Sequence, residues 1–205
     1  MWYSKILKPE MKQAFVKLKD SGLIKSFYLG GGTALALQIG HRESIDLDFF
    51  CEQHFNEDEI IEKLSKLEGF QLHDKDDYTV HGNIEKSKVS FLGYKYPLVF
   101  PLQEFNNIAI ADIRDVACMK LTAIAGRGSK RDFVDIFTVS QVYPLPVLFE
   151  AFKEKFSKVS YSENHVIRSL TYFEDAEKEV MPRMLKKVSW DKVKEFFIQE
   201  ASKLR

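Results

Sequence analysis

The sequence lacks most of the features that would place it outside ordinary intracellular proteins. It has two cysteines in 205 residues, Cys51 and Cys118, and both lie among apolar neighbours, so we interpret them as small core residues. No apolar run approaches the length needed to cross a bilayer, and the first ten residues lack the apolar segment of a signal peptide. We therefore expect a cytoplasmic protein with no membrane partner.

The sequence also lacks an excess of either charge. Thirty Lys and Arg balance thirty Asp and Glu, which argues against a protein coated with positive charge for non-specific binding to nucleic acid. A local basic groove stays open, and its candidates are Lys120, Arg127, Lys130 and Arg131. For a second basic cluster, around Arg183, Lys186 and Lys187, we favour solvated side chains. With 45% hydrophobic residues and 17 Phe, the chain can bury a sizeable core.

Hydrophobic periodicity predicts a mixture of strands and helices in the first half of the chain. We expect helices at 7–23, 33–39 (N-capped by Thr33) and 57–67 (N-capped by Asn56) and strands at 27–29, 45–51, 70–72, 78–81, 89–92 and 107–110. The pair Gly82–Asn83 predicts a turn between two of these strands, and 107–110 is expected at a sheet edge.

From about residue 113 the strand signals disappear. Helices are expected at 113–125 (N-capped by Asp112), 129–140, 147–156, 163–172 and 190–203. The predicted fold class is therefore α/β (α+β), with a mixed-sheet domain at 1–112 followed by a C-terminal helical bundle at 113–205.

The stretch from Gly30 to Phe50 carries the clearest chemical signal. A glycine-rich turn leads into a short helix, and the next strand holds Asp46 and Asp48 among apolar residues. Alternate strand residues point to the same face, so these two carboxylates lie side by side and repel each other unless a cation sits between them. Mg²⁺ prefers carboxylate and phosphate oxygens, and glycines before a helix allow close approach to a phosphate. The combination predicts phosphoryl or nucleotidyl transfer from a nucleoside triphosphate (NTP).

At these residues the chain resembles the nucleotidyltransferase superfamily, and more narrowly the AbiEii/AbiGii toxin family. The first family motif is matched by Gly31, Gly32, Thr33, Leu35, Arg42, Ser44, Asp46 and Asp48. A second block, between Met119 and Ile136, is matched by Lys120, Arg127, Lys130, Arg131, Asp132 and Asp135. The resemblance covers about residues 27–137 and implies a nucleotidyltransferase-like sheet domain.

The resemblance also implies roles for these residues. Asp46 and Asp48 would hold one or two Mg²⁺ (or Mn²⁺) ions, and Gly31, Gly32, Thr33, Arg42 and Ser44 would bind the triphosphate. Lys120 would contact the triphosphate or the departing pyrophosphate, and Asp132 and Asp135 complete the candidate catalytic set. The implied acceptor is an RNA 3′ hydroxyl, with tRNA favoured. Family members act as toxins of bacterial toxin–antitoxin or abortive-infection systems, so a cognate antitoxin is implied.

Several alternatives stay open at this point. Many superfamily members carry a third metal-binding carboxylate on a later strand, where this chain offers Ser90. Either Asp132 or Asp135 supplies that charge, or the site works with two carboxylates. The acceptor could instead be a protein hydroxyl or a small molecule. A non-catalytic nucleotide- or nucleic-acid-binding protein that retains the fold is the alternative from another functional class.

Overall fold

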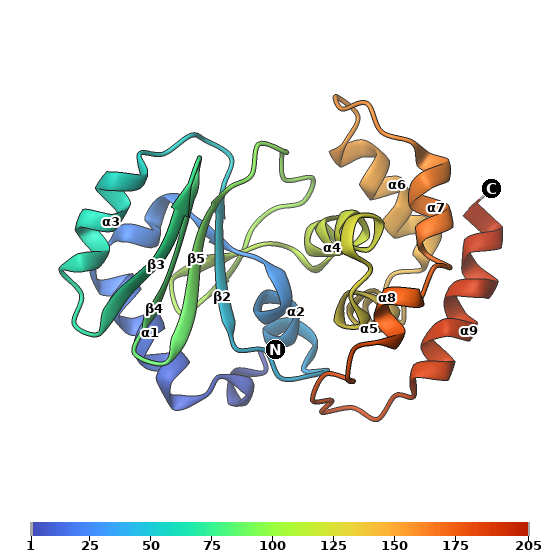
Figure 1. Cartoon of the computed structure of the whole chain (residues 1–205), viewed down its shortest axis with the longest axis horizontal. Coiled ribbons are helices and arrows are strands. Elements are labelled where there is room, and N and C mark those ends of the chain that lie inside the picture. The colour runs from blue at the N-terminus through green and yellow to red at the C-terminus, as the bar shows by residue number, and fades with distance from the viewer. Residues whose placement is uncertain (1, 205) are drawn as a thin grey trace.

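The chain forms a twisted mixed sheet with helices on both of its faces and a cluster of helices beside it, which confirms the predicted class. The computed structural model describes residues 2–204. The sheet, with α1 and α3, lies on one side, and α4 to α9 lie on the other (Figure 1). Helix α2 lies between the two groups and packs against both β2 and α4.

The sheet has seven strands in the order β3-β4-β5-β2-β1-β7-β6. Parallel pairing joins β2 to β5 and β1 to β7, and the other neighbours are antiparallel. The strands are β1 (Tyr28–Leu29), β2 (Asp46–Cys51), β3 (Phe70–Asp76), β4 (Thr79–Ile84), β5 (Ser87–Gly93), β6 (Gln103–Phe105) and β7 (Ile108–Ile110).

The α-helices follow the predicted order with shifted ends, except that the short helix α8 was not predicted. They are α1 (Pro9–Asp20), α2 (Gly31–Ile39), α3 (Glu57–Ser65), α4 (Ile113–Arg127), α5 (Lys130–Val139), α6 (Leu145–Lys155), α7 (Glu163–Ser169), α8 (Glu174–Glu177) and α9 (Trp190–Ala201). Short 3₁₀ turns occupy Ser4–Ile6, Leu23–Ser26 and Ser202–Leu204. The predicted N-caps Asn56 and Asp112 are confirmed, because each side chain accepts a hydrogen bond from the first turn of its helix.

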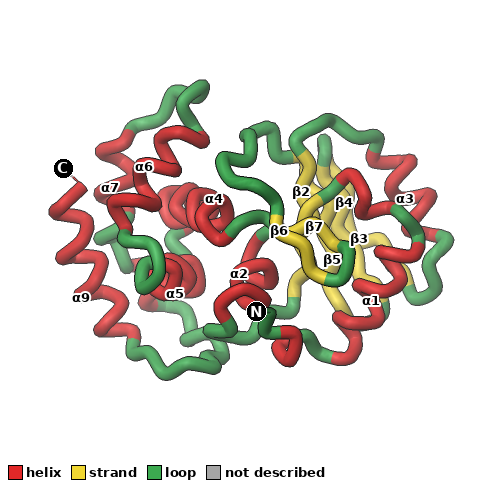
Figure 2. Tube along the Cα trace, turned by 180° about the vertical axis from the view of Figure 1, so that it is seen from behind, coloured by secondary structure: helices red, strands yellow, loops and turns green. Residues whose placement is uncertain are grey.

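Strand β2 separates an apolar face of the sheet from a polar one. Leu47 and Phe49 are fully buried, and Phe49 packs against Phe15 of α1 and Phe91 of β5. Asp46 and Asp48 alternate with them and point to the opposite face. Helices α1 and α3 cover the apolar face, as the view from behind also shows (Figure 2). The two carboxylates are thereby directed toward the helical side of the molecule.

Two predictions about the strands were wrong. Gly82 and Asn83 lie inside β4, not in a turn. The glycine is explained by close packing between strands, because a Cβ at Gly82 would lie 2.6 Å from the Gln71 carbonyl oxygen. The turn falls instead at Glu85, which has a φ of 56°. The strand predicted at a sheet edge, β7, has a neighbour on each side, and the edge is formed by β6, which the sequence pattern did not reveal.

The helical side is organised around α4, which packs against α2, α5, α6 and α7. Cys118 of this helix and Cys51 of β2 are free and buried, as predicted, and burial raises the pKa of the Cys51 thiol to about 11. Within residues 2–204, no helix combines the length and apolar character that crossing a membrane requires.

Candidate active site

A cavity of about 430 Å³ lies between the polar face of the sheet and α4. Seven of the ten predicted site residues line it, and they are Gly31, Gly32, Arg42, Ser44, Asp46, Asp48 and Lys120. The cavity therefore brings together predicted residues that lie up to 89 positions apart in the chain, from Gly31 to Lys120. Its remaining wall is formed by Phe50, His81, Lys88, Ser90, Leu92, Tyr94, Met119, Thr122, Ala123, Arg127 and Arg131.

The glycine-rich turn allows the start of α2 to lie directly against β2 and its two carboxylates. Gly31 has a φ of 63°, and a Cβ there would lie 2.7 Å from Asp48 Oδ2. A Cβ at Gly32 would lie 2.5 Å from Arg42 Nη2. The helix has no side-chain cap at Gly30, so its first N–H groups and positive dipole end lie beside the carboxylates and are suited to an anion.

Thr33 has a different role from the two that were predicted for it. It is the third residue of α2, not its N-cap, because Gly30 takes that position. Its hydroxyl donates a hydrogen bond to the backbone carbonyl of Asp46 at 2.5 Å, and the residue is fully buried. Thr33 therefore ties α2 to β2 and does not line the cavity.

The Asp46 and Asp48 carboxylates are largely without partners. Within residues 2–204, neither carboxylate forms an ion pair, and Ser90 of β5 lies in register beside Asp48. Burial, followed by repulsion from Asp46, raises the pKa of the Asp48 carboxyl above its ordinary value. Two adjacent carboxylates that repel each other provide oxygen ligands of the kind that a divalent cation prefers.

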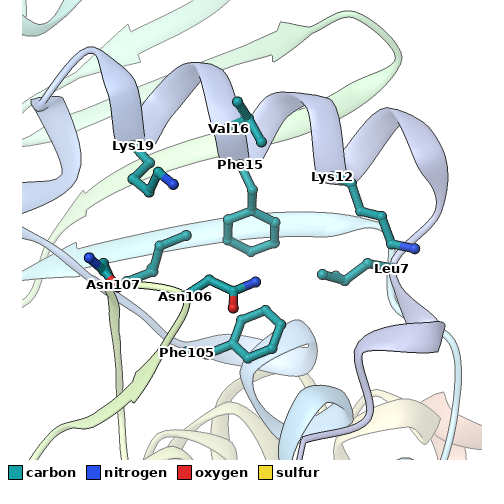
Figure 3. A pocket seen from close by; sticks show the side chains of 9 residues that line it. Leu7, Lys12, Phe15, Val16, Lys19, Phe105, Asn106 and Asn107 are labelled. Carbon is teal, nitrogen blue, oxygen red and sulfur yellow. The ribbon is translucent and has the colours of Figure 1, made fainter.

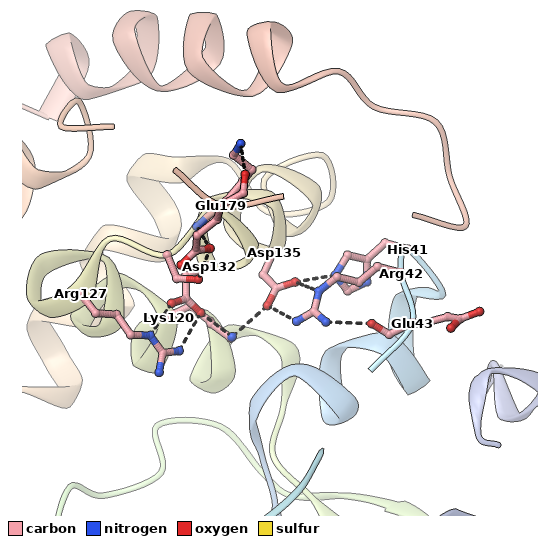
Figure 4. A network of polar contacts seen from close by, with 10 residues as sticks. His41, Arg42, Glu43, Lys120, Arg127, Asp132, Asp135 and Glu179 are labelled. Carbon is pink, nitrogen blue, oxygen red and sulfur yellow. Dashed lines mark hydrogen bonds and ion pairs between the residues drawn. The ribbon is translucent and has the colours of Figure 1, made fainter. Parts of the chain in front are cut away.

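Asp135 lies in a buried polar network beside the cavity (Figure 4). Its carboxylate accepts from Arg42 Nε at 2.6 Å and Nη2 at 2.8 Å, and it contacts His41 Nε2 at 2.7 Å and Lys120 Nζ at 2.9 Å. Burial opposes ionisation of Asp135, but Lys120 and Arg42 hold its pKa well below the ordinary value. Burial also lowers the pKa of His41.

Asp132 is the second acid of this network. It accepts from Lys120 Nζ at 2.6 Å and from Arg127 Nε at 2.8 Å, and it is fully buried. Three cations and two carboxylates therefore leave one net positive charge, carried on Lys120, Arg42 and Arg127 at the cavity wall. Neither Asp132 nor Asp135 lines the cavity, so the two acids hold the cations in place from behind.

The structure bears on two alternatives that the sequence left open. No three His, Cys, Asp or Glu side chains within residues 2–204 come together as a group that could hold a metal ion, and Asp132 and Asp135 are paired with cations outside the cavity. Lys130, expected in a basic groove, is buried and donates from Nζ to the Glu179 carbonyl at 2.5 Å. Arg131 and Arg127 do line the cavity.

Sequence reasoning missed two polar side chains of the cavity, His81 and Lys88. The available signal was the alternation in β4 and β5, where polar residues of one face share strands with buried Val80 and Val89. Lys88 is exposed and makes no ion pair with any other of residues 2–204. His81 lies in register with Ser90 on the neighbouring strand. In the sequence, Ser90 was noted only because it stands where related proteins carry a third carboxylate.

A second cavity, of about 440 Å³, lies between α1 and the β6–β7 hairpin (Figure 3). Its floor is apolar, with Phe15 and Phe105, and Lys12 and Lys19 lie at its rim. None of the nine residues that line it is acidic, so this cavity does not offer the donor set found around Asp46.

Part of the chain matches the model of a known protein family, and a relative aligns with nearly all of it. The model of the "Nucleotidyl transferase AbiEii toxin, Type IV TA system" family matches residues 13–110, which include the glycine-rich turn and both carboxylates. The chain is also 36% identical over 197 residues to the uncharacterized protein aq_aa25 of Aquifex aeolicus (strain VF5), an alignment that covers 93% of this chain and 94% of the relative.

Solved structures share the fold at low sequence identity. The nucleotidyltransferase toxin MenT4 (Rv2826c) of Mycobacterium tuberculosis H37Rv superposes with a TM-score of 0.57 and 14% identity, over 96% of this chain and 86% of that chain. JHP933 of Helicobacter pylori superposes with a TM-score of 0.54 and 17% identity, over 97% and 93%. The sheet and the helical cluster thus occur together in these proteins as well.

Proposed function

The chain belongs to the AbiEii family of nucleotidyl transferase toxins, and from this premise we propose that it moves a nucleoside monophosphate from an NTP to the 3′ hydroxyl of an RNA, with tRNA the favoured acceptor. Its enzyme class is that of a nucleotidyltransferase. The observation that carries the proposal is the cavity in which unpaired Asp46 and Asp48 face a cationic wall and the start of α2.

The triphosphate lies with its outer phosphates toward the start of α2. Free N–H groups at Gly31 and Gly32 and the helix dipole bind phosphate oxygens there. Arg42 and Ser44 flank Gly32 and supply further donors, and Asp135 fixes the Arg42 guanidinium in a bidentate pair. Lys120, held by Asp132, faces the same phosphates and stabilises the charge that develops on the pyrophosphate.

The reaction depends on Mg²⁺ or Mn²⁺. Asp46 and Asp48 are the residues that would hold the ion, and the donor set fits because both carboxylates lack cationic partners and share one face of β2. A divalent cation held by these two carboxylates would polarise the α-phosphate and lower the pKa of an attacking hydroxyl. The protein's own contribution is to orient the triphosphate and to keep the two carboxylates adjacent.

A polyanionic acceptor is supported by two cations at the cavity that have no acidic partner. Arg131 and Lys88 are both exposed, and neither forms an ion pair or side-chain hydrogen bond with any other of residues 2–204. Arg127 and Lys120 are instead committed to Asp132. Free arginine and lysine side chains bind phosphodiesters by displacing counterions, which favours RNA over a neutral acceptor.

We also propose a cellular setting for this activity. The protein acts as the toxin of a toxin–antitoxin or abortive-infection system in the cytoplasm, where NTPs and tRNA are available, and a cognate antitoxin counters it. Residues 1–112 and 113–205 act as two lobes, and the NTP is bound at their junction.

The test is transfer of label from each of the four α-³²P-labelled NTPs to purified bulk tRNA, with Mg²⁺ or Mn²⁺ and with EDTA. We expect label at the 3′ end in one or more of the metal-containing reactions and none with EDTA. An Asp46→Asn protein serves as the matched control. Label on added protein or on a small molecule but not on RNA would replace the acceptor. NTP binding without transfer to any acceptor would favour the non-catalytic alternative.

A further inference from the structure

Three side chains on neighbouring strands form a row across the polar face of the sheet. Asp48 of β2 is in register with Ser90 of β5, and Ser90 is in register with His81 of β4. Residues in register on adjacent strands point to the same face, and all three line the cavity. The row therefore extends from the carboxylates toward the side of the sheet opposite α2.

One hydrogen bond joins two members of this row, His81 and Ser90. Ser90 lies in register beside Asp48, so its hydroxyl can direct its proton toward that carboxylate. The Ser90 oxygen is then free to accept from His81 Nδ1, which lies 2.9 Å away. A neutral imidazole that donates from Nδ1 carries a bare lone pair on Nε2. Within residues 2–204, that Nε2 has no hydrogen-bond partner.

His81 lies on the side of Asp48 where the attacking hydroxyl is expected. Nucleotidyl transfer is an in-line displacement, so the nucleophile and the leaving pyrophosphate lie on opposite sides of the α-phosphorus. Helix α2, Arg42 and Ser44 lie on one flank of Asp48 and are suited to the outer phosphates. In the strand order β4-β5-β2-β1, His81 lies on the other flank.

We propose that His81 is a catalytic residue that accepts the proton of the acceptor hydroxyl, an inference that rests on the nucleotidyl transfer proposed above. The hydroxyl O–H bond breaks and its proton passes to His81 Nε2. The oxygen forms a bond to the α-phosphorus, and the bond from that phosphorus to the bridging oxygen breaks, so pyrophosphate leaves with the electron pair. Water then takes the proton from Nε2.

The test compares His81→Ala with the wild-type protein under the conditions in which bulk tRNA is labelled. We expect kcat to fall roughly 10²- to 10⁴-fold, as for loss of a general base, while the KM for NTP changes less than threefold. Added imidazole should restore transfer in proportion to its concentration, because it can occupy the space of the missing ring. His73→Ala is the matched control, since His73 is exposed on β3 and does not line the cavity.

Ser90→Ala tests the orientation of the ring. This variant keeps His81 but removes the bond to Nδ1, so we expect a smaller fall in kcat that imidazole does not restore. Melting temperatures of all the variants show whether they fold. Transfer by His81→Ala at the wild-type rate, or a loss that imidazole does not relieve, would overturn the role of His81 and leave the transferase function intact. Absence of transfer by the wild-type protein would instead overturn the function and this inference together.

Discussion

Two pairs of aspartates in this molecule look alike in sequence and behave differently in the structure. Asp46 and Asp48 lie two positions apart on β2, and Asp132 and Asp135 lie three positions apart on α5. Each spacing places the pair on one face of its element. The first pair lines a cavity and forms no ion pair with any other of residues 2–204, whereas the second is fully buried and paired with Lys120, Arg42 and Arg127.

The difference shows how surroundings assign a role to the same side chain. Ionised carboxylates that are buried need positive partners. The α5 pair finds them within the protein, because Lys120 on α4 bridges Asp132 and Asp135. The β2 pair does not, and in the proposed function a bound divalent cation would relieve the energetic cost of that arrangement. The α5 pair therefore positions cations, and the β2 pair is left free to attract one.

The comparison is tested most severely by removing charge from the β2 pair. We expect Asp46→Asn and Asp48→Asn each to lower kcat by about 10³-fold or more, since an electrostatic group used in the transition state is lost. Neither change should destabilise the fold, because each relieves repulsion between like charges and keeps the side-chain volume. Transfer kinetics and thermal melting measure the two effects separately.

Metal binding adds a readout that does not depend on activity. Millimolar Mg²⁺ should raise the melting temperature of the wild-type protein, because the ion binds the folded state, and EDTA should reverse the shift. Asp48→Asn should lose most of this shift. An equal shift in the wild-type and Asp48→Asn proteins would contradict assignment of the ion to β2.

The opposite behaviour is expected from the α5 pair. Asp135→Asn removes the buried carboxylate that pairs with Arg42 and Lys120, so we expect the free energy of unfolding to fall by roughly 3–5 kcal/mol. Transfer should fall as well, because both cations lose their orientation. Urea denaturation at pH 7 measures the first effect. A stable Asp135→Asn protein would show that the network is not what holds α5 against α4.

This loss should depend on pH with a definite sign. The pKa of Asp135 lies well below the ordinary value of 3.8, so the folded state binds the proton more weakly than the unfolded state. Its contribution to stability is therefore fully present above the ordinary pKa, and it is lost progressively as the pH falls from there to the lower pKa of the folded state. The gap in stability between wild type and Asp135→Asn should stay constant from pH 7 to about 5 and shrink below about 4.

The sequence predicted the order of elements and the position of the β2 pair because both follow from local patterns. Alternation in β2 was sufficient to place Asp46 and Asp48 on one face. Pairing across the chain is not a local property, so neither the Asp135–Arg42 pair nor the proximity of His81 to Asp48 was visible in sequence. The role of Gly82 was hidden from sequence for the same reason, because it depends on a close approach to a neighbouring strand and not on a turn.

A smaller effect should separate the free cations from the committed ones. We expect Arg131→Glu and Lys88→Glu each to weaken binding of bulk tRNA by about tenfold at 100 mM salt and to reduce the salt dependence of binding. Both variants should keep the melting temperature of the wild-type protein, because neither side chain has a partner within residues 2–204. Lys63→Glu, on α3 across the sheet, is the matched control. Unchanged tRNA affinity in both reversals would contradict an RNA acceptor.

The smallest effect is expected at Thr33, which touches the β2 pair only through the backbone. Thr33→Val keeps the shape of the side chain and removes the hydrogen bond to the Asp46 carbonyl. A single buried hydrogen bond contributes on the order of 1 kcal/mol, equivalent to about 2–4 °C in melting temperature for a chain of this size. Thr33→Ser retains the hydroxyl and should recover most of that loss. Because Thr33 lies outside the cavity, NTP affinity should be unchanged in both variants. A loss of NTP affinity in Thr33→Val without a change in melting temperature would return Thr33 to the triphosphate site that the sequence predicted.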